Sequence, residues 1–111
     1  VSGAFHSSLM ASAANRFAEA LKEVDILAPR IPVISNVDAQ IEATPEIIRQ
    51  RLAKQITSSV QWVASMEYIM AQGISDFIEI GPGKVLKGLM RRINPQATVA
   101  NIEKPADLDS L

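Results

Sequence analysis

Hydrophobic side chains recur along residues 8–24 at the spacing of a helix that buries one face. They stand three or four positions apart, and most of the side chains between them are charged or carry amides. Pro29 and Pro32 exclude a helical continuation, because proline lacks the amide proton that a helix interior requires. The pattern therefore predicts one helix over residues 8–24, followed by an extended connection.

Two further helices are predicted in the middle of the chain. Residues 44–56 begin with Thr-Pro-Glu, which is typical of a helix start, because threonine caps the first turn and proline suits the first helical position. Residues 58–73 contain a second run of inward-facing apolar positions and end in a glycine. Either Ser58 or Ser59 is expected to cap this second helix.

Three short runs rich in β-branched residues predict strands over residues 33–37, 76–80 and 98–102. A fourth helix is expected over residues 84–93. Strands that alternate with helices indicate an α/β domain with a mostly parallel sheet and flanking helices. The residues expected to form the core are Met10, Phe17, Leu21, Ile34, Leu52, Trp62, Met66, Ile78, Ile80, Leu86 and Leu89.

Composition narrows the class of protein. With 111 residues, 48% of them hydrophobic and 21% charged, the chain is one globular domain or part of one. A net charge of −1 offers no electrostatic footprint for nucleic acid or an anionic membrane, and no apolar run is long enough for a membrane span. The absence of cysteine is compatible with a cytoplasmic protein, and one histidine without clustered acids predicts no metal site.

His6 is the only histidine and the first candidate for chemistry. Imidazole is the side chain best suited to exchange a proton near neutral pH. By chemistry alone, a single histidine near a chain end is more often a solvated or capping residue. Ser7 and Ser8 are interpreted as helix-start residues, with a hydroxyl that accepts from the first turn, because adjacent side chains rarely point at one another.

Four stretches resemble motifs of the malonyl-CoA:acyl carrier protein transacylases, the acyltransferases of bacterial fatty acid synthesis. They are residues 3–10 (Gly-Ala-Phe-His-Ser-Ser-Leu-Met), 35–39 (Ser-Asn-Val-Asp-Ala), 60–62 (Val-Gln-Trp) and 79–86 (Glu-Ile-Gly-Pro-Gly-Lys-Val-Leu). Residues 1–111 are thus similar to the carboxyl-terminal part of that family. The resemblance implies the carboxyl-terminal portion of a hydrolase-like large subdomain, without the nucleophile-bearing amino-terminal part and the ferredoxin-like subdomain. A first residue other than methionine agrees with a cleaved, split or truncated chain.

The resemblance implies the activity of an [acyl-carrier-protein] S-malonyltransferase. A serine attacks the malonyl thioester with His6 as general base, and the phosphopantetheine thiol of acyl carrier protein then takes the malonyl group. The backbone carbonyl of Gln55 is expected to orient the ring of His6, so that the side chain of Gln55 should matter little. The implied partners are malonyl-CoA, acyl carrier protein and the amino-terminal part of the same enzyme, with no cofactor. Because the nucleophile is missing, the chain alone is expected to be inactive.

Two alternatives remain open at this point. The chain could be the equivalent segment of a polyketide synthase acyltransferase domain, or a non-catalytic α/β interaction module in which His6 is incidental. Residues 81–84, Gly-Pro-Gly-Lys, lack the spacing of a phosphate-binding loop, and we interpret them as a tight turn from strand to helix. A supporting role of Lys84 near the acyl or pantetheine site stays open, as does the role of Asn36.

Overall fold

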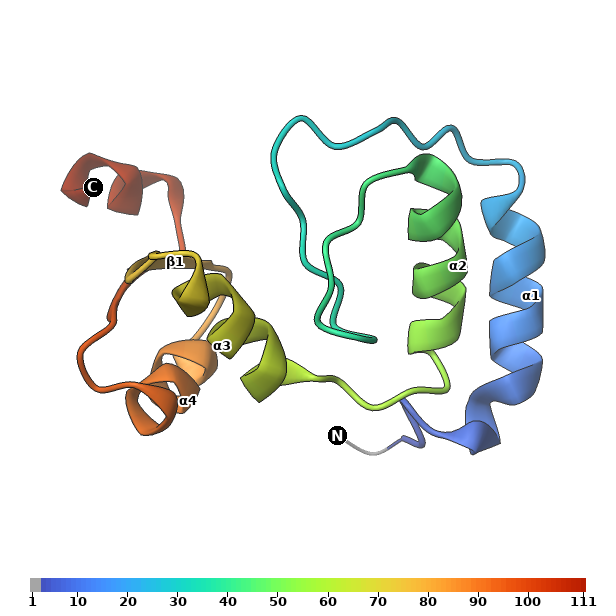
Figure 1. Cartoon of the computed structure of the whole chain (residues 1–111), viewed down its shortest axis with the longest axis horizontal. Coiled ribbons are helices and arrows are strands. Elements are labelled where there is room, and N and C mark those ends of the chain that lie inside the picture. The colour runs from blue at the N-terminus through green and yellow to red at the C-terminus, as the bar shows by residue number, and fades with distance from the viewer. Residues whose placement is uncertain (1–2) are drawn as a thin grey trace. The chain divides into compact units, whose positions relative to one another are not determined.

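The computed structural model describes residues 3–111, which form helices and a small parallel sheet. They divide into two compact units, one ending at Ser65 and one beginning at Met66. The elements, in chain order, are η1 (Ser8–Met10), α1 (Ala11–Leu21), α2 (Pro45–Gln55), α3 (Trp62–Ala71), β1 (Asp76–Ile80), α4 (Val85–Ile93), β2 (Thr98–Ile102) and η2 (Pro105–Ser110) (Figure 1).

In the first unit, α1 and α2 lie side by side and run in opposite directions (Figure 1). Arg49 of α2 donates from Nε to the carbonyl of Leu21 at 3.3 Å and from Nη2 to the carbonyl of Val24 at 2.9 Å. Carbonyls at the end of a helix lack partners within it, so Arg49 ties the end of α1 to the early part of α2. The start of α1 and the end of α2 consequently meet at the opposite end of the pair.

The start of α2 forms as its sequence predicts. Thr44 is the capping residue, and its hydroxyl accepts from the amide of Ile47 at 3.3 Å. Pro45 occupies the first helical position, where its missing amide proton costs nothing. The helix ends at Gln55, one residue before the predicted end.

The predicted strand over residues 33–37 is wrong. Within the described part of the chain, this segment contributes only an isolated antiparallel bridge between Ile34 and Ile41. The chain reverses directly afterwards, because Ser35 Oγ accepts from the amide two residues on, at 3.2 Å, and Ala39 adopts a left-handed φ of 57°. The turn residues thus end the extended pairing before a strand can form.

The predicted cap of the third helix is also wrong. α3 begins at Trp62, so Ser58 and Ser59 lie in the connection that leads to it. The amide of Gln61, directly before the helix, donates to the carbonyl of Asn36 at 2.7 Å. This bond to another segment, rather than a serine hydroxyl, holds the chain where α3 starts.

The second unit contains the β1–α4–β2 arrangement that the sequence predicts. β1 and β2 pair in parallel, with Asp76 opposite Thr98 and Ile80 opposite Ile102. A parallel pair requires a crossover connection, and α4 supplies it. Met90 of α4 is the most enclosed apolar residue among those described as core, at 2% exposure.

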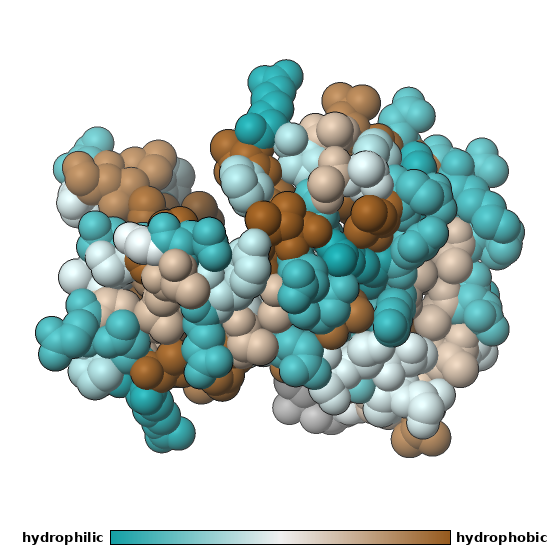
Figure 2. All heavy atoms as spheres, in the orientation of Figure 1, coloured by the Kyte–Doolittle hydropathy of each residue, from teal (hydrophilic) through white to brown (hydrophobic). Residues whose placement is uncertain are grey.

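The predicted core is only partly correct for the described residues. Leu21 and Met66 are buried, whereas Met10, Ile34 and Trp62 are only partly covered. Ile80 is 81% exposed and Ile78 is 53% exposed, whereas Ile102, which lies opposite Ile80 on β2, is buried. Figure 2 shows hydrophobic atoms at the molecular surface. The predicted core residues that are exposed instead are Phe17, Leu52, Ile78, Ile80, Leu86 and Leu89.

None of the helices formed by residues 3–111 combines the length and the apolar character that crossing a membrane requires.

Candidate active site

His6 lies in the turn that leads into η1 and α1, and its side chain is exposed. Its φ of 63° is left-handed, a conformation that is uncommon for residues other than glycine, although histidine, asparagine and aspartate adopt it more readily than most. Backbone conformations of this kind cluster at functional sites, where the surrounding structure holds them in place. The fold therefore holds His6 in an uncommon backbone conformation and leaves its side chain exposed to solvent.

Ser7 closes this turn. Its hydroxyl donates to the carbonyl of Ala4 at 2.5 Å, across the residues that flank His6. The predicted role of this hydroxyl as a cap acceptor is wrong: Ser7 occupies the capping position by its backbone, but its side chain makes no cap bond. Its carbonyl instead accepts from the amide of Met10 at 3.1 Å. Ser7 thus links the histidine turn to the helix behind it.

The structure brings His6 and Gln55 together across 49 positions of sequence, with Nδ1 of His6 2.9 Å from the backbone oxygen of Gln55. A carbonyl oxygen can only accept, so the Nδ1 atom of this pair carries the proton and donates it. The second ring nitrogen, Nε2, is then an unprotonated acceptor in the neutral ring. The antiparallel pairing of α1 with α2 produces this contact, because His6 precedes one helix and Gln55 ends the other.

The side chain of Gln55 has a role that the sequence did not reveal. Its Nε2 donates to the carbonyl of Ser58 at 2.9 Å and to that of Ser59 at 3.4 Å. The sequence predicted no role for this side chain, and the structure gives it two local hydrogen bonds. The polar run Thr57–Ser59 was the available signal, since a turn outside a helix leaves carbonyls in need of donors.

A cavity of about 210 Å³ adjoins Gln55 in the first unit. Asn36 lines it, and Arg51 reaches it while its guanidinium binds Asp38 at 2.9 Å and the carbonyl of Ile41 at 2.8 Å. Asn36 therefore shares a cavity with Gln55 and holds the start of α3 through its carbonyl, which accounts for its position without assigning it chemistry. The lining residues are Ile34, Ser35, Asn36, Glu42, Arg51, Leu52 and Gln55.

Residues 81–84 form the tight turn that we expected. Gly81 and Gly83 have φ values of 130° and 83°, and a Cβ at either would meet nothing within 4 Å, so the backbone conformation rather than space requires glycine. The amide of Gly83 donates to the carboxylate of Glu103 at 2.6 Å. The amide of Gly83, which in a phosphate-binding loop would donate to a bound anion, therefore already donates to a carboxylate of the protein.

Glu79 likewise accepts hydrogen bonds from backbone amides, here at the start of α4. Its carboxylate accepts from the amides of Leu86 at 3.0 Å and Lys87 at 2.9 Å, and from the side chain of Asn101 at 2.8 Å. Burial raises the pKa of Glu79, but these donors and the charge of Lys87 outweigh burial and hold the pKa below its ordinary value. Glu79 is therefore a charged group that joins β1 to α4 and β2.

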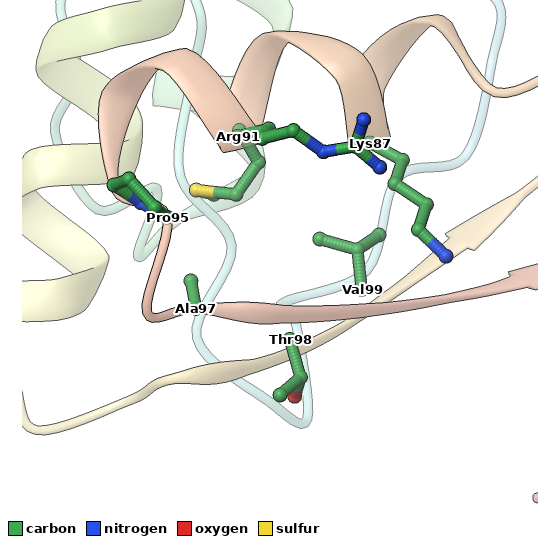
Figure 3. A pocket seen from close by; sticks show the side chains of 7 residues that line it. Lys87, Arg91, Pro95, Ala97, Thr98 and Val99 are labelled. Carbon is green, nitrogen blue, oxygen red and sulfur yellow. The ribbon is translucent and has the colours of Figure 1, made fainter.

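A second cavity, of about 290 Å³, lies between α4 and the start of β2 (Figure 3). Figure 3 shows Lys87 and Arg91 extending from α4, with Thr98 and Val99 on β2. Neither His6 nor Gln55 lines it. The lining of this cavity includes the cationic side chains of Lys87 and Arg91 but no histidine or carboxylate.

No family model matches the chain. Malonyl CoA-acyl carrier protein transacylase of Salmonella typhimurium is 41% identical over 105 residues, which are 95% of this chain and 34% of that protein. The chain is therefore similar to one part of this transacylase, about a third of its length. The Staphylococcus aureus enzyme of the same name is 41% identical over 108 residues, 97% of this chain and 35% of its own length.

A solved structure agrees with the similarity in sequence. The crystal structure of an acyl-carrier-protein-S-malonyltransferase from Bartonella henselae superimposes with a TM-score of 0.93 at 41% identity, over 99% of this chain and 35% of that one. The predicted fold class, the carboxyl-terminal portion of such an α/β enzyme, is confirmed. The chain spans about a third of the length of the relatives that it matches.

Proposed function

We propose that this chain is the carboxyl-terminal part of an enzyme that transfers a malonyl group from malonyl-CoA to the phosphopantetheine thiol of acyl carrier protein. The relatives carry the name of this activity. A single observation carries the residue assignment: Nδ1 of His6 lies 2.9 Å from the carbonyl of Gln55, which leaves Nε2 free to accept a proton. We assign His6 as general base and the Gln55 carbonyl as the group that orients it.

The proposed reaction has two steps. A serine in the amino-terminal part of the enzyme gives its proton to Nε2 of His6 and attacks the malonyl thioester. The thioester bond breaks, and coenzyme A leaves with the proton from His6. The carrier thiol then gives its proton to His6 and attacks the serine ester, and the serine leaves with that proton. His6 is neutral again at the end, and the reaction uses no cofactor beyond its two substrates.

This proposal divides the enzyme between two parts of one protein. Residues 1–111 supply the base, whereas the amino-terminal part supplies the nucleophilic serine and the ferredoxin-like subdomain. We propose acyl carrier protein as the macromolecular partner. A solved complex described as a type II PKS acyl-carrier protein with its malonyl-transacylase supports this, since that transacylase matches 99% of this chain with a TM-score of 0.93 at 38% identity.

The test is malonyl transfer to acyl carrier protein by the full-length enzyme with His6→Ala or His6→Asn. Both variants should lower kcat/KM on the order of 10³-fold or more, because each removes the base. Asparagine adopts the left-handed conformation more readily than alanine, so His6→Asn separates the loss of the imidazole from a change of the backbone. Near-wild-type transfer by His6→Asn would contradict the role of His6 as base.

A further inference from the structure

We infer that the side-chain amide of Gln55 is a positioning group for His6, because it fixes the turn that aims the carbonyl of the same residue at the imidazole. The inference rests on the proposed role of His6 as base. It assigns Gln55 two tasks, one for its backbone oxygen and one for its side chain. The side chain does not touch the reacting atoms and acts only through the carbonyl.

Gln55 holds Ser58 at two points. The backbone oxygen of Gln55 accepts from the amide of Ser58 at 3.2 Å, and its side-chain Nε2 donates to the carbonyl of Ser58 at 2.9 Å. The same nitrogen also donates to the carbonyl of Ser59 at 3.4 Å. Both backbone groups of Ser58 are therefore bonded to one residue, which closes the turn at residues 55–59.

This closure matters because the carbonyl of Gln55 lies at a helix end. Helix ends fray, and a last carbonyl without a fixed partner turns toward water. Without the side-chain bond, the backbone oxygen of Gln55 would be held within its own turn only by the amide of Ser58. That N···O distance of 3.2 Å is near the long limit for a hydrogen bond. The amide of Gln55 adds the second constraint, so that the oxygen keeps its 2.9 Å contact with Nδ1 of His6.

Loss of this constraint would change which nitrogen of the His6 ring carries the proton. An imidazole without a fixed acceptor at Nδ1 distributes its proton between the two nitrogens, and the form protonated at Nε2 cannot act as base. Substrate binding would be unaffected, because the turn makes no contact with substrate in the proposed mechanism. The expected signature is a lower kcat at an unchanged KM for malonyl-CoA.

The decisive variant is Gln55→Met in the full-length enzyme. Methionine keeps the backbone carbonyl and the length of the side chain, but it cannot donate. The matched control is Gln50→Met on the same helix, where the amide is exposed and donates only to Glu46 at 3.3 Å. We expect Gln55→Met to lower kcat on the order of tenfold, the equivalent of one or two hydrogen bonds, whereas Gln50→Met keeps wild-type kcat.

Two further measurements separate positioning from a general structural effect. In a His6→Ala background, Gln55→Met should cause no additional loss, because the group through which it acts is gone. The ¹⁵N resonances of His6 in labelled enzyme should shift toward the form protonated at Nε2 in Gln55→Met and not in Gln50→Met. Should Gln55→Met fold poorly, Gln55→Glu serves instead, since a carboxylate accepts and cannot donate to the two carbonyls.

Each outcome decides one proposal. Wild-type kcat in Gln55→Met, an equal loss with and without His6, or an unchanged tautomer would each overturn the positioning role, while a large loss in His6→Asn would still support His6 as base. Near-wild-type activity of His6→Asn would instead remove the proposed role of His6 as base, and the role of Gln55 with it.

Discussion

At the scale of single residues, the candidate site depends on backbone conformations that local hydrogen bonds must hold. His6 is left-handed, and Ser7 donates to Ala4 across the same turn. A residue in this conformation returns to the more common right-handed or extended regions unless neighbouring groups restrain it. The hydroxyl of Ser7 is the described side-chain group that supplies such a restraint.

Ser7→Ala should therefore weaken malonyl transfer by the full-length enzyme. One hydrogen bond contributes roughly 1 kcal/mol, so we expect kcat/KM to fall about fivefold. Ser12→Ala on the exposed side of α1 is the matched control and should keep wild-type activity. Equal activity of the two variants would mean that the helix alone holds the histidine turn.

The site residues divide by how the sequence could reveal them. Resemblance pointed to His6 and to the carbonyl of Gln55, and the structure places them in contact. The side-chain bonds of Gln55 and Ser7 were not predicted from the sequence, because hydroxyl and amide groups can each bond to several backbone partners. Which partner each takes depends on how the turns fold, and a pattern of residue types does not encode that choice.

At the scale of elements, helices with strong terminal signals were predictable. The Thr-Pro-Glu start of α2 is local chemistry, and it forms within one residue of the predicted bounds. The strand predicted over residues 33–37 failed because its β-branched residues are followed by a reversal of the chain, in which Ala39 takes a left-handed conformation. A strand depends on pairing with a distant segment, so local preference alone does not decide it.

Glu79 connects three elements, and its removal should be visible in the pH dependence of stability. Its pKa in the folded protein lies below the ordinary value of 4.5, so the folded state favours the charged carboxylate. This contribution is fully present above the pKa of the unfolded chain. It is lost as the pH falls through the lower pKa of the folded state.

Urea unfolding of wild-type enzyme and Glu79→Gln measures this effect. At pH 7 the variant should unfold at lower urea than the wild type, and the difference should shrink as the pH falls below about 4.5. Glu67→Gln, an exposed site on α3 with the same change of charge, should differ little from wild type at either pH. A difference for Glu79→Gln that stays constant with pH would show that its charge is not the stabilising feature.

At the scale of the whole chain, the described residues leave much apolar surface uncovered. Ile80 is 81% exposed on one face of a two-stranded parallel sheet, and Val85 is 70% exposed at the start of α4. Parallel sheets are normally covered on both faces, and open strand edges promote association. The sequence predicted β1 and α4 correctly but placed Ile80 in a core, because a hydrophobic pattern does not identify which part of a protein covers an apolar side chain.

We therefore expect the isolated 111-residue chain to be poorly folded or prone to aggregate. Purified alone, it should show weak thermal cooperativity and bind a hydrophobic dye, whereas the full-length enzyme should do neither. Sedimentation reports its association state. Cooperative unfolding of the isolated chain as a monomer would contradict this expectation.

The pairing of α1 with α2 also determines where the length of this chain can change. Each helix has eleven residues, on the order of 16 Å, and residues 22–44 join them at the end remote from His6. Doubling such a connection costs only about 0.6 kcal/mol in closure entropy. One residue added inside α2 instead rotates every later position by about 100° and turns the carbonyl of residue 55 away from the imidazole. Insertions and deletions that keep the contact between His6 and Gln55 are thereby confined to one end of the helical pair.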